Sequence, residues 1–156
     1  MFALHTFSGR TRPETGMNLL STHQKLYERT DGRLGHRMLG VPVLLLRTTG
    51  RRSGETRTNG LTYALDGDTW LIVPSNGGSD KAPGWLHNLR ADPTAEIQVA
   101  RRRVPVVATV RTPDDADYAR LWDIVNAGNR DRYRAYAVKT RRPIPVVVLR
   151  KADPGA

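Results

Sequence analysis

Short runs of alternating apolar residues, each bounded by turn residues, recur between residues 41 and 149 and constrain the fold more than any other feature. In NGLTYALDGDTWLIVP two such runs flank Asp66-Gly67, a pair favoured in two-residue type I′ turns, which predicts a β-hairpin. TAEIQVA and RVPVVATV alternate in the same way and predict a second hairpin that turns near Arg101 and Arg102. With VPVLLLRTT and the closing IPVVVLR, the chain provides five or six strands.

Helical periodicity is confined to segments outside these strands. MNLLSTHQKLYERTDG, PGWLHNLRADP and RDRYRAYAVKT are each predicted to form a short helix. TPDDADYARLWDIVNAG is the clearest helix, with Thr112 as the cap, Pro113 in the first turn and Gly128 at the end. Strands joined mainly by hairpins, with helices at the periphery, indicate an α+β fold built on an antiparallel β-barrel.

The length of 156 residues fits one compact domain with its own core. Residues 1–17 lack an extended hydrophobic region and are interpreted as a flexible N-terminal arm, which leaves residues 18–156 as a single domain. The chain has no cysteine, which excludes disulfides, thiolate chemistry and cysteine-ligated zinc. The longest apolar run, around residues 41–46, is far too short to cross a membrane.

The formal net charge of +10 and the isoelectric point of about 10.8 indicate an anionic partner. A nucleic acid, an anionic membrane surface, and a phosphorylated or polycarboxylate small molecule all satisfy that requirement. Composition alone does not choose among them.

The segment RTTGRRSGETRTNGL, residues 47–61, carries four arginines and three glycines. Glycine lets a backbone approach an anion closely, and Thr49, Ser53 and Thr58 offer hydroxyl groups. The guanidinium groups of its arginines suit phosphate or carboxylate, which they can bind in bidentate fashion. The residues favour an anion-binding loop and a solvated basic turn about equally.

A second glycine-containing loop, PSNGGSDKAPGW, has the same two interpretations: a ligand-binding loop or a flexible connection. Trp85 at its end is more typical of a core anchor than of a ligand contact, and Asn88 of a surface residue. Tyr133 and Tyr136 lie three apart and so share one face of the short helix predicted there. Core packing and a pocket-lining role are both open for this pair.

Several common catalytic patterns are absent from the sequence. The four histidines, His5, His23, His36 and His87, are scattered without metal-ligand spacing, and no Walker A sequence or dinucleotide fingerprint is present. No metal site is predicted. An enzyme with this sequence is expected to take its difficult chemistry from a bound cofactor.

Three segments together resemble the deazaflavin-dependent nitroreductase family, the branch of the split β-barrel oxidoreductases that uses coenzyme F420. They are PVLLLRTTGRRSGETRTNGLTY, DGDTWLIVPSNGGSDKAPGWLHNLRADPTAEIQV and YAVKTRRPIPVVVL, and they cover roughly residues 39–149. The combination of TTGRRSG, SNGG, PGWLHNLRADP and KTRRPIPV is specific, although each piece alone is not. The resemblance implies a six-stranded, mainly antiparallel split β-barrel with the deazaflavin in a groove across it.

The resemblance also implies which site residues contact each part of the cofactor. The basic loop is expected to hold the anionic cofactor tail, a phosphodiester followed by an oligoglutamate, and residues 74–88 to contact the ring and linker. The residues expected to bind the cofactor are Thr49, Gly50, Arg51, Arg52, Ser53, Arg57, Thr58, Asn59, Pro74, Ser75, Asn76, Gly77, Gly78, Ala82, Trp85 and Asn88. Tyr133 and Tyr136, expected to close over the substrate, and Ser75 are the predicted catalytic residues.

The activity that the resemblance implies is hydride transfer from reduced coenzyme F420 to an electron-poor acceptor such as a quinone or a nitroaromatic. A tyrosine phenol beside the acceptor would orient an oxygen or relay a proton. Arg52 stands where members often have lysine. Arg130 stands where some members carry another tyrosine, which leaves nitroimidazole reduction open.

Two other functions remain as alternatives. The first is a split-barrel oxidoreductase that uses flavin mononucleotide, although a single phosphate needs fewer arginines than this loop provides. The second is a basic nucleic-acid-binding β-barrel, against which stands the absence of aromatic residues between the arginines of residues 47–61.

The expected partner is a small-molecule electron acceptor, with no nucleic acid. The expected location is the cytoplasm. Weak peripheral association with the inner face of the cell membrane, through the N-terminal helix, stays open because quinones are membrane-soluble. The oligomeric state is not predicted.

Overall fold

The computed structural model describes residues 37–38 and 41–153, and within them every strand pairing is antiparallel. The predicted N-terminal arm and the first predicted helix lie outside the described residues. The strands are β1 (Arg37–Met38), β2 (Val41–Thr49), β3 (Thr56–Thr62), β4 (Ala64–Asp66), β5 (Thr69–Ile72), β6 (Thr94–Val99), β7 (Arg102–Arg111) and β8 (Val146–Lys151).

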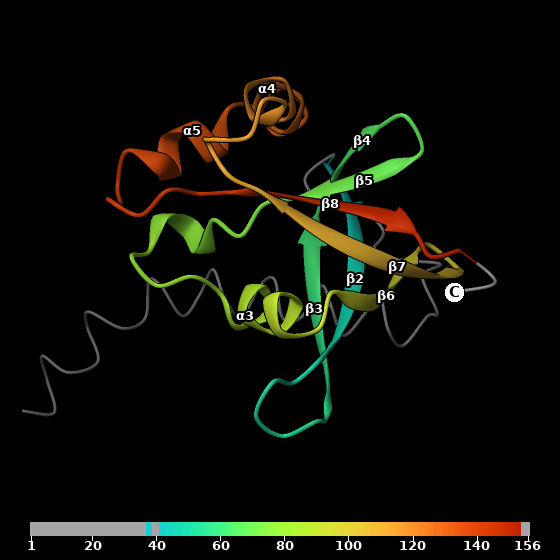
Figure 1. The fold of residues 1–156 in the computed structure, drawn as a ribbon. Helices are drawn as coiled ribbons and strands as arrows, with labels where there is room; N and C mark the ends of the chain where they lie inside the picture. Colours follow the sequence, from blue (N-terminus) through green and yellow to red (C-terminus); the bar gives the residue numbers. More distant parts are fainter. Residues whose placement is uncertain (1–36, 39–40, 154–156) are drawn as a thin grey trace, which may run out of the picture.

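The eight strands belong to one sheet, with the order β1-β2-β6-β7-β8-β5-β4 and with β3 also paired to β2. Strand β3 therefore lies at one end of the series β3-β2-β6-β7-β8-β5-β4, and β4 lies at the other end. In the sequence, only Tyr63 separates the end of β3 from the start of β4. The sheet must curl until its two edges meet at this corner, which gives the split barrel predicted from the resemblance (Figure 1).

The described helices are the 3₁₀ turn η1 (Asn76–Gly78), α3 (Gly84–Ala91), α4 (Tyr118–Ala127) and α5 (Arg132–Ala137). Helices α4 and α5 lie together on one side of the curled sheet, near β4, β5 and β8, whereas α3 contacts β2 and leads into β6 (Figure 1). The connection between β2 and β3 extends beyond the barrel. The α+β class with peripheral helices is confirmed.

Alternation along the strands divides the core into two main layers. In β5, Trp70 and Ile72 point into the barrel, where they meet side chains from β2, β6, β7 and β8 and from α3. The intervening Leu71 belongs to a second cluster that α4 and α5 cover, with Leu121 and Tyr133 among its members. The period of two in the sequence thus reports two buried faces of the same strand.

Two details of the strand prediction are wrong. The first arm of the first hairpin is not one strand: β3 pairs with β2, β4 pairs with β5, and the chain changes partner at Tyr63. This split and the two-residue β1 raise the strand count from six to eight. The turn also moves by one residue, because Asp66 pairs with Thr69 and leaves Gly67 and Asp68 as the loop. Of these two only Gly67 has a positive φ, at 60°, as in a type II′ turn rather than a type I′ turn.

The predicted start of the α4 helix is also wrong. Thr112 does not cap a helix: its backbone N–H donates to the Asp115 carboxylate at 2.7 Å, which stabilises a turn before the helix. Helix α4 begins only at Tyr118 and ends, as predicted, at Gly128. An aspartate two or three residues after a threonine competes for the groups that a helix cap would use.

Candidate cofactor site

The loop between β2 and β3 is closed by its own backbone. The Gly50 N–H donates to the Glu55 carbonyl at 2.7 Å, and the Gly54 N–H donates to the Gly50 carbonyl at 2.8 Å. A Cβ atom on Gly50 would lie 2.8 Å from Ser53 Oγ and 3.1 Å from the Glu55 carbonyl oxygen, so the loop is tightly closed at this point. Gly54 has a φ of 74°, which also favours glycine. The glycines of the basic loop therefore fix its shape.

Asn88 on α3 attaches this loop to the barrel. Its Oδ1 accepts hydrogen bonds from the backbone N–H of Arg51 at 3.1 Å and from the Arg51 guanidinium at 3.3 Å. Its Nδ2 donates to Thr48 Oγ1 at 3.1 Å. The side chain is buried, unlike the surface residue that the sequence favoured. Asn88 thus holds the basic loop in place against α3.

A cavity of about 570 Å³ opens between this loop, strand β3 and the start of α3. Its walls carry three arginines with hydroxyl, amide and backbone groups, and the aromatic Trp85. The lining residues are Gly50, Arg51, Arg52, Ser53, Thr56, Arg57, Thr58, Asn59, Pro83, Gly84, Trp85 and Asn88. Nine of the residues expected to bind the cofactor are in this set: Gly50 to Ser53, Arg57 to Asn59, Trp85 and Asn88. A polar, cationic cavity of this kind suits an extended anion.

Thr49 lies apart from this group. It lines a smaller cavity of about 360 Å³ with Arg47, Thr48 and Glu96, and only Thr56 belongs to both cavities. In the smaller cavity Arg47 is occupied by Gln98 at 2.9 Å and by Glu96 at 3.4 Å. The smaller cavity therefore offers no free cation from Arg47.

The three arginines of the larger cavity differ in how firmly they are held. Arg51 is attached to Asn88, whereas the Arg57 guanidinium makes only a 3.4 Å contact with Ser53 Oγ and a 3.9 Å contact with Glu55. Both side chains of the Arg57–Glu55 pair are exposed, so this ion pair contributes little. Arg52 is exposed. Arg52 and Arg57 are thus the cations that a ligand can engage at the lowest cost.

The loop after β5 holds the second group of expected site residues. Asn76, Gly77 and Gly78 have φ values of 46°, 65° and 88°, an uninterrupted left-handed run. The N–H groups of Gly78 and Ser79 are occupied by the carbonyls of Ser75 and Asn76, so they do not face a ligand. Ser75 is buried.

Arg142, which the sequence analysis missed, clamps this loop. Its guanidinium donates to the carbonyls of Pro74 at 3.1 Å, Ser75 at 2.9 Å and Ser79 at 2.9 Å. Burial lowers the pKa of Arg142, and nearby Asp80 opposes that change. The KTRRPIP segment therefore supplies a structural cation. Its targets are carbonyl groups more than sixty residues away, which leave no pattern in the sequence.

The two tyrosines lie beside this loop, on α5. Tyr133 is buried, and its hydroxyl lies 2.9 Å from Thr62 Oγ1 at the end of β3. Burial raises the pKa of the Tyr133 phenol, and hydrogen bonds from Thr62 and Asn129 partly offset this rise. Tyr136 is half-buried, and its ring centroid lies 6.5 Å from that of Tyr133. Lys139 Nζ lies 5.8 Å from the Tyr136 ring centroid.

Strand β3 connects the two groups of site residues. Thr56 lines the cationic cavity, and Thr62, six residues further along the strand, contacts Tyr133. At a rise of about 3.3 Å per residue these two points lie about 20 Å apart. The segment from Ser75 to Gly84 joins the same two regions, because Gly84 lines the cavity and Gly78 lies against α5. Ala82, between them, packs on the barrel core.

Among the described residues, no group of three or more histidine, cysteine, aspartate or glutamate side chains could hold a metal ion. Within the same residues, no helix combines the length and the apolarity needed to cross a membrane.

A curled antiparallel sheet with a cationic cavity at one end of β3, and with the buried Tyr133 and the half-buried Tyr136 at the other, defines a split-barrel protein. Residues 19–151 match the family of F420H(2)-dependent quinone reductases, and the chain belongs to that family. An F420H(2)-dependent quinone reductase of Mycobacterium tuberculosis is 53% identical over 135 residues, which cover 86% of this chain and 91% of that protein.

One solved structure agrees with this assignment, and a second shares the fold. An F420-H2-dependent reductase is 29% identical, with a TM-score of 0.62 over 69% of this chain and 93% of that one. A structure described as a domain-swapped dimer is 26% identical, with a TM-score of 0.63 over 86% of this chain and 98% of that one. The resemblance to the deazaflavin-dependent proteins is therefore confirmed at the level of the family.

Proposed function

We propose that this protein transfers a hydride from reduced coenzyme F420 to a quinone. Family membership supports the cofactor and the class of acceptor. The structural observation that carries the proposal is the placement of the cationic cavity and the tyrosine cluster at opposite ends of β3. An elongated cofactor with an anionic tail and a reactive ring requires such a separation.

The residues of the cavity fit the anionic tail. Arg52 and Arg57 would bind its phosphate and carboxylate groups, and Ser53 would donate a hydroxyl hydrogen bond. The absence of a side chain on Gly50 keeps the loop closed beneath them. When bound, the reduced coenzyme supplies a hydride, and the quinone becomes a quinol on taking that hydride and one proton.

The residues at the far end of β3 would receive the ring and the acceptor. We assign Ser75 and the segment Pro74–Gly78 to the ring, because Arg142 holds their backbone in one conformation. Tyr136 would contact the acceptor, since it is only half-buried. Tyr133 would hold an acceptor oxygen or relay the proton through its hydroxyl, which already has a partner in Thr62. A nitroaromatic acceptor remains a prediction for the same site.

The proposal is tested by binding and by turnover together. Trp85 lines the cavity, so tryptophan fluorescence should respond to coenzyme F420 and much less to flavin mononucleotide. The protein should then oxidise the reduced coenzyme when quinones are added. Tighter binding of flavin mononucleotide would favour the flavin alternative. A steep salt-dependent affinity for single-stranded DNA would favour the nucleic-acid alternative.

We further propose weak peripheral membrane association, with the cytoplasm as the main location. This proposal rests on the sequence of residues 17–32, outside the described part of the structure, and on the lipid solubility of quinones. Flotation with vesicles of anionic and of zwitterionic lipid tests it. Association with anionic vesicles that is lost when residues 1–32 are deleted would support it, and absence of flotation would contradict it.

A further inference from the structure

The connection between α4 and α5 has a backbone conformation that its surroundings must enforce. Arg130 and Asp131 are consecutive and both have a φ of 60°, in the left-handed region. That region is unfavourable for residues with a Cβ atom, and more so for arginine than for aspartate. Such strain persists only where the surroundings determine the conformation. The source of that constraint lies in two asparagines.

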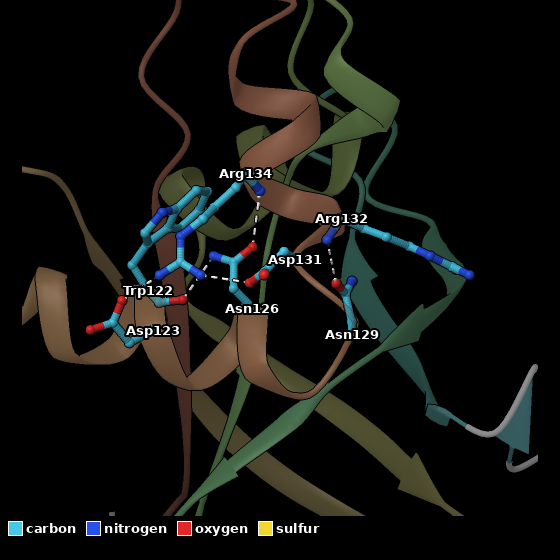
Figure 2. A network of polar contacts seen from close by, with 7 residues as sticks. All are labelled: Trp122, Asp123, Asn126, Asn129, Asp131, Arg132 and Arg134. Atoms are coloured by element: carbon cyan, nitrogen blue, oxygen red, sulfur yellow. Dashed lines mark hydrogen bonds and ion pairs between the residues drawn. The ribbon is translucent and has the colours of Figure 1, made fainter.

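Helix α5 also begins without a cap of its own. Asp131, at the N-cap position, accepts no hydrogen bond from a backbone N–H of the first turn, and its carboxylate pairs with the Arg134 guanidinium at 2.6 Å. Instead, Asn129 Oδ1 accepts from the Arg132 N–H at 3.1 Å, and Asn126 Oδ1 accepts from the Arg134 N–H at 2.9 Å (Figure 2). The first-turn N–H groups of a helix need such acceptors. Here the acceptors come from α4 and from the connection.

Asn126 is engaged at every polar group of its side chain. It is fully buried, and its Nδ2 donates to the Trp122 carbonyl at 2.8 Å. Its own carbonyl accepts from the N–H groups of Asp131 at 2.9 Å and Asn129 at 3.2 Å, on either side of the left-handed Arg130. Asn126 thus bonds to the last turn of one helix, the connection and the first turn of the next.

The position of α5 determines where both tyrosines lie. Tyr133 is the second residue of α5, and Asn129, whose side chain accepts from the Arg132 N–H, also partly offsets the rise that burial causes in the pKa of the Tyr133 phenol. The ring of Trp122, whose carbonyl Asn126 holds, lies 6.4 Å from that of Tyr133. A rotation of α5 would separate the Tyr133 hydroxyl from Thr62 and would move Tyr136 relative to η1.

We propose that Asn126 and Asn129 are positioning residues for the reaction: they hold the left-handed connection and thereby place Tyr133 and Tyr136 at the acceptor site. The proposal rests on the role given above to the tyrosines. The claim that the two asparagines place the tyrosines can be tested independently of that role, because the placement of the tyrosines can be measured without turnover.

The test uses Asn126→Ala, with Asp123→Asn as the matched control. Asp123 lies on the same helix and forms an exposed ion pair with Arg134, so its loss should change little. The protein, which has five tyrosines, is labelled with 3-fluorotyrosine, and the Tyr133 and Tyr136 resonances are assigned from Tyr→Phe variants. We expect Asn126→Ala to shift or broaden both resonances. The resonance of Tyr118, the first residue of α4, should stay in place, because its hydroxyl donates to the Ile144 carbonyl.

The same variants are then assayed with reduced coenzyme and a quinone. We expect Asn126→Ala to lower kcat at least tenfold and to leave the Kd of the coenzyme within twofold, whereas Asp123→Asn changes neither. Unshifted Tyr133 and Tyr136 resonances in Asn126→Ala would overturn the positioning role. Shifted resonances with unchanged kcat would support placement and overturn the tyrosine assignment.

A rescue variant separates this role from simple packing. Glycine at position 130 removes the cost of the left-handed conformation. Asn126→Ala with Arg130→Gly should therefore recover at least part of the lost kcat and return the Tyr133 resonance toward its original position. A packing cavity at Asn126 would not respond to position 130, so absence of rescue overturns the proposal. If Asn126→Ala does not fold, Asn129→Ala with and without Arg130→Gly gives the same comparison.

Discussion

Asn88 Oδ1 accepts a hydrogen bond from the Arg51 backbone N–H at 3.1 Å and so joins helix α3 to the basic loop. The loop is closed within itself, and this contact fixes the closed unit to the barrel. The cationic cavity therefore depends on a buried amide that carries no charge. A basic loop alone would present the same charges without a fixed geometry.

Asn88→Ala is expected to destabilise the protein and to weaken coenzyme binding together. It leaves the buried Thr48 hydroxyl and the part-buried Arg51 N–H without their partner, and an unpaired buried polar group costs about 1–3 kcal/mol. Thermal unfolding and a fluorescence titration measure the two effects. His87→Ala, on the neighbouring position of α3, is the control and should change neither. Unaltered coenzyme affinity in Asn88→Ala would show that the loop needs no anchor.

Arg52→Ala combined with Arg57→Ala should weaken coenzyme binding sharply without loss of the fold. A charge-assisted hydrogen bond is worth about 1.5–3 kcal/mol, and exposure reduces this, so a rise of about 10- to 100-fold in Kd is expected. The matched control is Arg101→Ala with Arg102→Ala, which removes the same charge from the exposed β6–β7 turn. Equal losses in the two double variants would mean that net charge, and not the cavity, attracts the coenzyme.

Gly78→Ala should disturb the contact between η1 and α5, whereas Gly77→Ala should not. Both glycines have positive φ values, 88° at Gly78 and 65° at Gly77, so both variants carry the backbone cost of about 1–2 kcal/mol. Only at Gly78 would a Cβ atom meet another group, the Tyr136 carbonyl at 2.9 Å. Turnover should fall further in Gly78→Ala. Equal kcat values for the two variants would argue against direct contact between the loop and α5.

Strands were the most predictable part of the fold, because alternation reports burial directly. The predicted VPVLLLRTT run coincides with β2. The change of partner at Tyr63 was not predictable, since a residue between two strands shows no sign of which sheet edge follows. The predicted start of α4 was wrong because Thr112 donates its backbone N–H to Asp115 and forms a turn there.

The candidate site, like the fold, was predictable from the sequence only in part. Arginines, glycines and tyrosines mark chemistry by residue type, and most of the expected cofactor residues do line one cavity. Arg142 and Asn126 act on backbone carbonyl and N–H groups, which every segment of the chain offers. Their partners become evident only when the fold brings distant segments together.

Stability at high pH should depend on Tyr133. Because burial raises its pKa above the ordinary value of 10.0, the phenol stays neutral in the folded protein at pH values where it ionises in the unfolded chain. Its contribution is therefore complete below pH 10 and is lost as the pH rises from there through the folded pKa. Between pH 10 and 11 the free energy of unfolding should fall more steeply than in Tyr133→Phe, by up to about 1.4 kcal/mol per pH unit. Chemical denaturation measures both slopes, and identical slopes would contradict the raised pKa.

The central claim is tested most directly by a single turnover. Protein saturated with reduced coenzyme F420 is mixed rapidly with a soluble quinone, and absorbance records the oxidation of the coenzyme while chromatography measures the quinol. The account predicts oxidation far faster than in buffer, with one quinol formed for each coenzyme oxidised. Oxidation no faster than the uncatalysed reaction, with every quinone tried and with the coenzyme shown to be bound, would contradict it.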